Sequence, residues 1–182
     1  ELSTLALQAK DRVLGLGPGE WVSRLAWSET GRMAALVGRV DRGTGAFSTG
    51  PWLLVERSDG SFGRHEPGVL STLRVDDMLW TADAQLWIAS SQGLAGLDPE
   101  QPEALPLWSQ DPAVAGRDLT DLHLHEGSLW ALGSGGAAEL TPDGVWRRHT
   151  VGDGSSAEDL VQAGTGSNGE LWLLDGNGTV YQ

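Results

Sequence analysis

A Leu-Trp pair recurs about every 43 residues in the second half of this chain, at Leu86-Trp87, Leu129-Trp130 and Leu171-Trp172. A Gly-rich turn follows each pair at a similar distance. One repeat, residues 118–150, divides into four short apolar runs that are separated by Gly, Pro, Asp or Ser, the residues that favour tight turns. A unit of four short strands that repeats at this period buries its apolar faces against its neighbours.

The repeat predicts an all-β chain that folds as a β-propeller of about four blades, each a sheet of four antiparallel strands. We expect a single domain over residues 1–182, with blades over residues 21–65, 69–110, 118–150 and 159–182. Because the last blade is short of strands, we expect residues 2–16 to complete it, so that strands from both termini close the ring and remove exposed strand edges. The alternatives are a part of a longer propeller and a half-ring that another copy completes.

The second blade contains the least regular stretch of the repeat. We expect its first strand over Val69–Val75, followed by a long connection over Asp76–Gln85. The apolar residues Met78-Leu79-Trp80 inside this connection extend one of the flanking strands. Helical periodicity of 3.6 residues is nearly absent from the chain, which favours strands throughout.

The composition limits the partners that the chain can bind. The 182 residues include 25 acidic and 12 basic side chains, which gives a formal net charge of −13. This charge argues against nucleic acid and anionic membranes as partners, because both are bound by clustered Lys and Arg. The chain has no cysteine, which excludes disulfides, thiolate metal sites and cysteine nucleophiles. No apolar run approaches the roughly 20 residues of a membrane-spanning helix.

The stretch Leu86–Asp98, LWIASSQGLAGLD, resembles the repeat of the two-component-regulator propeller family. In that repeat a Leu-Trp-Ile strand, a short turn and a Gly-Leu strand follow one another. The segments Leu129–Thr141 and Leu171–Tyr181 keep the Leu-Trp pair and lose the Gly-Leu half. The resemblance implies a propeller that serves as a sensory, extracytoplasmic domain and binds a ligand or a partner. It transfers no site residues, because the motif residues are structural, and the compartment stays open.

The three repeated tryptophans occupy the same place in each unit. We expect Trp87, Trp130 and Trp172 to pack between blades, where a large flat side chain fills the layer between two sheets. A ligand cage built from these rings is the alternative.

Two histidines are the candidate metal ligands. His123 and His125 lie two residues apart on one expected strand, so their side chains point to the same face. A zinc site would need a third ligand from another blade, and His65 and His149 fall on outer strands. Asp175 begins a stretch that resembles a calcium loop without its closing acid, so an Asx turn is expected there. We therefore assign no cofactor and no metal, with a divalent cation at His123 and His125 as the alternative.

The sequence contains no nucleophile elbow and no phosphate-binding loop, so no catalytic residue is assigned. We expect a non-enzymatic binding or scaffold module that presents a loop face to a protein or small-ligand partner. The connections between second and third strands form that face, and the longest of them gives the candidate contact residues Arg39, Arg42 and Phe47. A propeller-type lyase or hydrolase that uses the central channel, and a structural subunit of a larger assembly, are the alternatives.

Overall fold

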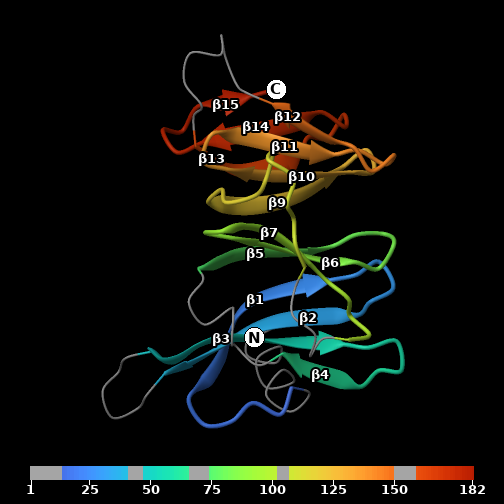
Figure 1. Cartoon of the computed structure of the whole chain (residues 1–182), viewed down its shortest axis with the longest axis vertical. Helices are drawn as coiled ribbons and strands as arrows, with labels where there is room; N and C mark the ends of the chain where they lie inside the picture. Colours follow the sequence, from blue (N-terminus) through green and yellow to red (C-terminus); the bar gives the residue numbers. More distant parts are fainter. Residues whose placement is uncertain (1–13, 41–46, 66–73, 102–106, 150–158) are drawn as a thin grey trace.

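The computed structural model describes residues 14–40, 47–65, 74–101, 107–149 and 159–182. These residues form fifteen strands and no helix. The strands pair into four antiparallel sheets that are stacked in chain order along the longest axis of the molecule (Figure 1). Within the described residues, no helix is long and apolar enough to cross a membrane.

Each sheet is built from strands that are consecutive in the chain, and each strand pairs with the next. The first sheet contains β1 (Glu20–Trp27), β2 (Met33–Val40), β3 (Phe47–Glu56) and β4 (Phe62–His65). The second contains β5 (Val75–Trp80), β6 (Leu86–Ser90), β7 (Gly93–Leu97) and β8 (Leu107–Trp108). The third contains β9 (Leu119–His125), β10 (Ser128–Gly133), β11 (Gly136–Leu140) and β12 (Trp146–His149). The fourth contains β13 (Leu160–Thr165), β14 (Leu171–Asp175) and β15 (Val180–Tyr181).

This arrangement confirms the all-β repeat and its four-strand unit, with one correction in the second sheet. The connection expected over Asp76–Gln85 begins only after Trp80, because β5 runs from Val75 to Trp80; residues 69–73 of the expected first strand lie outside the described residues. The stretch Met78-Leu79-Trp80 extends this first strand, as expected. The physical reason is burial, because Met78 and Trp80 fill the layer between the first and second sheets.

Apolar side chains fill the layer between each pair of neighbouring sheets. Period-two alternation along the strands sends one set of side chains toward the preceding sheet and the other set toward the following one. Leu86 and Ile88 thus face the first sheet, whereas Ala89 and Trp87 face the third. Trp130 likewise packs toward the fourth sheet, which confirms the predicted role for Trp87 and Trp130. Trp172 is 38% exposed, since no further sheet follows among the described residues.

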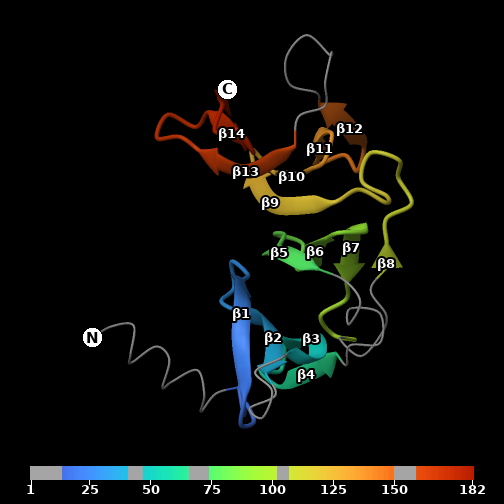
Figure 2. The ribbon, with the colours of Figure 1, turned by 90° about the vertical axis from the view of Figure 1, so that its left-hand side faces the viewer.

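Polar contacts join the first strands of neighbouring sheets, which lie toward one side of the stack (Figure 2). Arg24 Nε donates to the carbonyl of Asp76 at 2.7 Å. The amide of Leu122 donates to Asp77 Oδ2 at 3.0 Å, and the amide of Ala163 donates to Asp121 Oδ2 at 2.7 Å. We call these three contacts the inner-strand latches. They satisfy backbone groups at the sheet edge that would otherwise stay unpaired.

The first and fourth sheets stand at opposite ends of the stack (Figures 1 and 2). Of residues 2–16, which were expected to complete the last blade, only Leu14–Leu16 fall in the described part of the chain. Leu14 and Gly15 form a turn there rather than a strand. Leu14 and Leu16 pack against side chains of the first sheet, such as Trp52 and Leu54. Residues 2–13 lie outside the described residues, so their joining the last blade stays a prediction.

Candidate binding cleft

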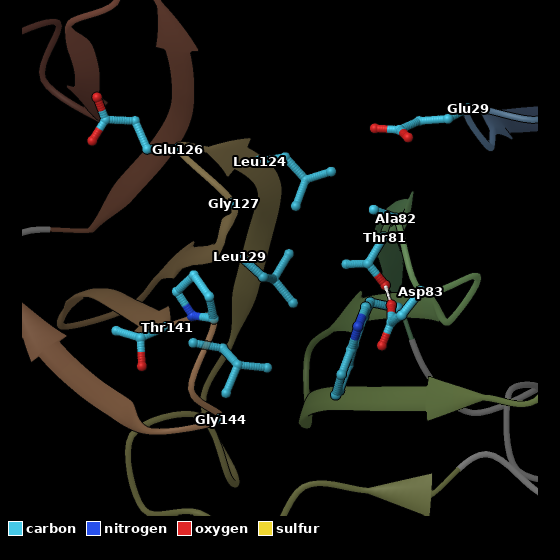
Figure 3. A pocket seen from close by; sticks show the side chains of 13 residues that line it. Glu29, Thr81, Ala82, Asp83, Leu124, Glu126, Gly127, Leu129, Thr141 and Gly144 are labelled. Atoms are coloured by element: carbon cyan, nitrogen blue, oxygen red, sulfur yellow. Dashed lines mark hydrogen bonds between the residues drawn. The ribbon is translucent and has the colours of Figure 1, made fainter.

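A surface cleft of about 480 Å³ opens between the second and third sheets (Figure 3). Three turns surround it: the β5–β6 turn at Thr81–Asp83, the β9–β10 turn at Glu126-Gly127 and the β11–β12 turn at Thr141–Gly144. Glu29, from the β1–β2 turn of the first sheet, also lines the opening. The cleft is therefore formed by connections between first and second strands and between third and fourth strands.

The floor of the cleft is apolar. It consists of Trp87, Leu124, Leu129 and Leu140, which belong to the layer between the second and third sheets. Leu129 is buried, whereas Trp87, Leu124 and Leu140 are only half-buried, because the layer opens to solvent at this end. An apolar side chain that enters the cleft would therefore remove these partly exposed groups from water.

Exposed carboxylates stand around the rim of the cleft. Glu29, Asp83 and Glu126 supply them, and none of the described residues that line the cleft is basic. Thr81 Oγ1 donates to Asp83 Oδ1 at 2.5 Å and holds that carboxylate over the edge (Figure 3). Beyond Pro142, the hydroxyl of Thr141 donates to Asp143 and lowers its pKa. The opening is thus negative at neutral pH and suited to a cation with an apolar body.

The β9–β10 turn has a strained backbone at Glu126, the residue that supplies its carboxylate. Glu126 has a φ of 49° and Gly127 a φ of 78°. A two-residue hairpin turn with positive φ at both positions favours Asn, Asp or Gly at the first position, because a larger side chain is strained there. Glu126 lines the rim, with its carboxylate pointing outward from the apolar floor (Figure 3). Backbone strain of this kind concentrates at functional sites.

A second carboxylate cluster lies on the inner strands, at two of the latches. Asp77 of β5 and Asp121 of β9 are close enough for their carboxyl groups to share a hydrogen bond. Burial raises the pKa of Asp77. Burial, followed by the nearby Asp77, raises the pKa of Asp121 to about 6, against the lowering effect of the Ala163 amide. The pair therefore holds a proton at a pH where an ordinary aspartate has lost it.

We expect Asp121→Asn to change how stability depends on pH. The folded-state pKa of Asp121 lies above its value in the unfolded chain, so its contribution to the free energy of unfolding falls as pH rises from about 4 to about 6. Asparagine keeps an oxygen for the Ala163 amide and carries no charge. The variant should match the original protein near pH 4 and exceed it by on the order of 1 kcal/mol at pH 7, after allowance for solvent screening.

Urea unfolding of both proteins across this pH range checks the expectation. A stability difference that is the same at pH 4 and pH 7 would contradict it. Asp77→Asn serves as a second variant, because removal of the neighbouring carboxylate should lower the pKa of Asp121 and reduce the same pH dependence.

The two candidate histidines point to the same side, as the strand spacing predicted. His123 Nε2 lies 2.9 Å from Thr165 Oγ1, and His125 Nδ1 lies 3.4 Å from the same hydroxyl. Burial, and then the charge of His125, lowers the pKa of His123. Among the described residues, no group of three or more His, Asp or Glu side chains is placed to hold a metal ion.

Of the expected partner-binding residues, only Arg39 has a side chain in the described part of the structure, and it lies at the other end of the strands from the cleft. Arg39 is exposed near the end of β2, Arg42 lies outside the described residues, and Phe47 begins β3 with its side chain outside the described part. The sequence predicted a binding face at the connections between second and third strands, whereas the cleft lies at the other connections. One signal was available, because Asp83 and Glu126 are 43 residues apart and so occupy matching turns of successive repeats.

Four-stranded antiparallel sheets that stack through their faces are the blades of a β-propeller. Solved structures share this fold. YCF48 bound to a D1 peptide matches with a TM-score of 0.54 and 17% identity, over 87% of this chain and 49% of that one. The extracellular domain of the putative hybrid two-component system BT3049 from B. thetaiotaomicron matches with a TM-score of 0.50 and 14% identity, over 87% and 26%.

This chain therefore spans about half the length of the first structure and about a quarter of the second. The second likeness agrees, in the fold alone, with the propeller resemblance that the repeat motif indicated. No protein-family model matches the sequence, and no curated protein matches it either.

Proposed function

We propose that the protein is a non-enzymatic binding module whose cleft between the second and third sheets takes a basic segment of a partner protein. The observation that carries this proposal is the combination of an apolar floor with a rim of three carboxylates. The net charge of −13 adds a long-range attraction for a basic partner. The propeller YCF48, a neighbour in fold, is described as bound to a peptide, which supports a peptide as the ligand class.

The apolar stem of an Arg or Lys side chain fits the floor of the cleft, and its charged head fits the rim. Its methylene stem would lie along Leu124 and Leu129, while its charged head would reach the carboxylates of Glu29 and Asp83. Trp87 offers a ring face to the same cation, a contact worth about 0.5 to 2 kcal/mol depending on its exposure. Rim-exposed ion pairs contribute roughly 0 to 1 kcal/mol each, so we expect a modest, salt-sensitive affinity.

The loop face that carries Arg39, Arg42 and Phe47 is the second candidate surface of the same function. Basic and aromatic side chains there would suit an acidic partner. The two surfaces lie at opposite ends of the strands, because one uses turns after first strands and the other the connection after a second strand. Variants on each surface can therefore be tested independently.

Binding of a fluorescent octapeptide of alternating Arg and Leu tests the cleft. We expect the double variant Asp83→Asn, Glu126→Asn to weaken this binding about tenfold and to reduce its salt dependence, since about 1.4 kcal/mol corresponds to a factor of ten. Asparagine suits the positive φ of position 126, so the fold should be kept. The pair Asp159→Asn, Glu170→Gln, next to the first and second strands of the fourth sheet, removes the same number of carboxylates away from the cleft and serves as the control.

Two outcomes would oppose the proposal: equal binding of a peptide with Glu in place of Arg, or unchanged affinity in the double variant. A loss of binding on Arg39→Ala, with the cleft variant unaffected, would move the site to the other loop face.

A further inference from the structure

The same three apolar positions recur on the face that each sheet turns toward the next. Two are on the second strand, two residues apart, and the third lies opposite on the third strand. We call this the forward face. Its members are Trp87, Ala89 and Leu94 in the second sheet, Trp130, Leu132 and Ala137 in the third, and Trp172, Leu174 and Val180 in the fourth.

The following sheet covers the forward face of the second and third sheets. Leu94, Leu132 and Ala137 have no solvent-exposed surface. On the fourth sheet, in contrast, Trp172 is 38% and Val180 56% exposed. The fourth sheet therefore has an apolar surface of the kind that elsewhere in this molecule lies against another sheet.

The inner-strand latch is also repeated on the fourth sheet. Asp77 pairs across the sheet with Ala89 and Asp121 with Leu132, and Gln162 pairs with Leu174 in the same register. Each aspartate accepts a hydrogen bond from the next inner strand. Gln162 is exposed, and its side chain forms no hydrogen bond with the described residues. Its amide oxygen can accept from a backbone amide as the aspartates do, without adding charge.

The first sheet presents the matching receiving surface at the other end of the molecule. In the third sheet, Leu122 faces the second sheet and is 4% exposed. Leu25 occupies the same register position in the first sheet, since Leu25 pairs with Ala35 as Leu122 pairs with Ala131. Leu25 is 45% exposed, and its neighbour on the same face, Trp27, is 60% exposed.

Leu14 and Leu16 pack on this end of the first sheet beside β2 and β3, which leaves Leu25 and Trp27 of β1 exposed. This matters because first strands contact one another directly at all three internal junctions. The uncovered strand is thus the one that a further inner strand would approach.

We propose that the forward face of the fourth sheet docks on the β1 side of the first sheet in a second copy of this chain. The forward face of the fourth sheet and the β1 side of the first sheet are the two surfaces that meet at each junction between sheets inside the chain. Contact between them in two copies would therefore repeat the internal junctions. Trp172, Leu174 and Val180 lie against Leu25 and Trp27, and Gln162 accepts from the Leu25 amide as Asp77 accepts from Leu122. A head-to-tail contact that is used twice closes two chains into one ring.

Light scattering of the whole chain at micromolar concentration tests the proposal, and a particle of twice the mass of one chain is expected. Leu174→Glu removes the forward face and Leu25→Glu the receiving surface, so each variant alone should be a monomer. An equimolar mixture of the two retains one intact junction and should form a heterodimer that dissociates at least tenfold more readily. Val145→Glu, at an exposed position in the connection between β11 and β12, is the control for charge. Circular dichroism confirms folding of each variant.

Several results would overturn the proposal. A monomeric original protein would do so directly. A dimer that Leu174→Glu abolishes and Leu25→Glu leaves intact would show that two fourth sheets pack on each other instead. Separate monomers in the equimolar mixture, with both variants folded, would show that the two surfaces do not recognise each other.

Discussion

Gly133→Ala is expected to destabilise the protein by more than about 3 kcal/mol, because the added methyl group has no space. Gly133 ends β10 and pairs with Leu119 of β9 at an irregular point of the ladder. A Cβ there would lie 2.0 Å from the carbonyl oxygen of Asp118 and 2.7 Å from the Cα of Leu119. Both are backbone atoms, so no side-chain rotation relieves the overlap.

The local hydrogen bonds make this site rigid. The carbonyl of Asp118 accepts from the Ser134 amide at 2.8 Å. Arg117 Nε donates to the Ser134 carbonyl at 2.8 Å, and its guanidinium reaches the Gly136 carbonyl at 3.1 Å. A shift of β9 away from the new methyl group would strain these bonds together.

Urea unfolding measures the effect, and Gly164→Ala is the matched control. Gly164 lies in β13, and a Cβ there would meet no atom within 4 Å. We expect the control to change the free energy of unfolding by less than about 1 kcal/mol, in either direction. Equal unfolding midpoints for the two variants would refute the steric explanation.

Leu86→Ala is expected to cost about 2 to 5 kcal/mol, the usual range for a truncated core leucine. Leu86 is fully buried between the first and second sheets, against residues such as Leu53 and Val55. Removal of its side chain leaves a cavity that sheets held on both sides cannot easily fill. Leu171 occupies the same place in the last Leu-Trp repeat and is only half-buried.

Leu171→Ala should therefore cost about 1 kcal/mol, because the half-buried side chain of Leu171 loses less buried surface on truncation. The comparison uses the same substitution at the same repeat position, so intrinsic strand propensity cancels. The midpoint of urea unfolding for both variants gives the difference. A Leu171→Ala cost as large as that of Leu86→Ala would mean that the layer between the third and fourth sheets is packed as tightly as the layer between the first and second sheets.

The proposed cleft and the proposed junction use different parts of the molecule. The cleft lies between the second and third sheets, whereas the junction involves Leu25 and Trp27 at one end and the fourth sheet at the other. Variants at Asp83 and Glu126 should leave the mass of the particle unchanged. The Leu174→Glu monomer, in turn, should keep its affinity for the basic peptide.

The sequence alone determined the architecture of this protein. Leu-Trp pairs at a constant period, alternation along each strand and Gly-rich turns are local signals, and they predicted four strands in residues 118–150, where β9 to β12 lie. The placement of Trp87 and Trp130 between sheets followed from the same repetition. The sequence made the connection after the first strand of the second sheet too long, because Met78 and Trp80 are held in β5 by packing against the first sheet.

The tertiary structure alone decided where the candidate site lies. Glu29, Asp83 and Glu126 come from three different sheets, and only the stacking of those sheets brings these residues around one cleft. The raised pKa of Asp121 likewise depends on Asp77, which is 44 positions earlier in the chain and adjacent only across a sheet junction. Strand and turn formation depends on neighbours in sequence, whereas a cleft, a shared proton and an uncovered face depend on which surfaces meet after folding.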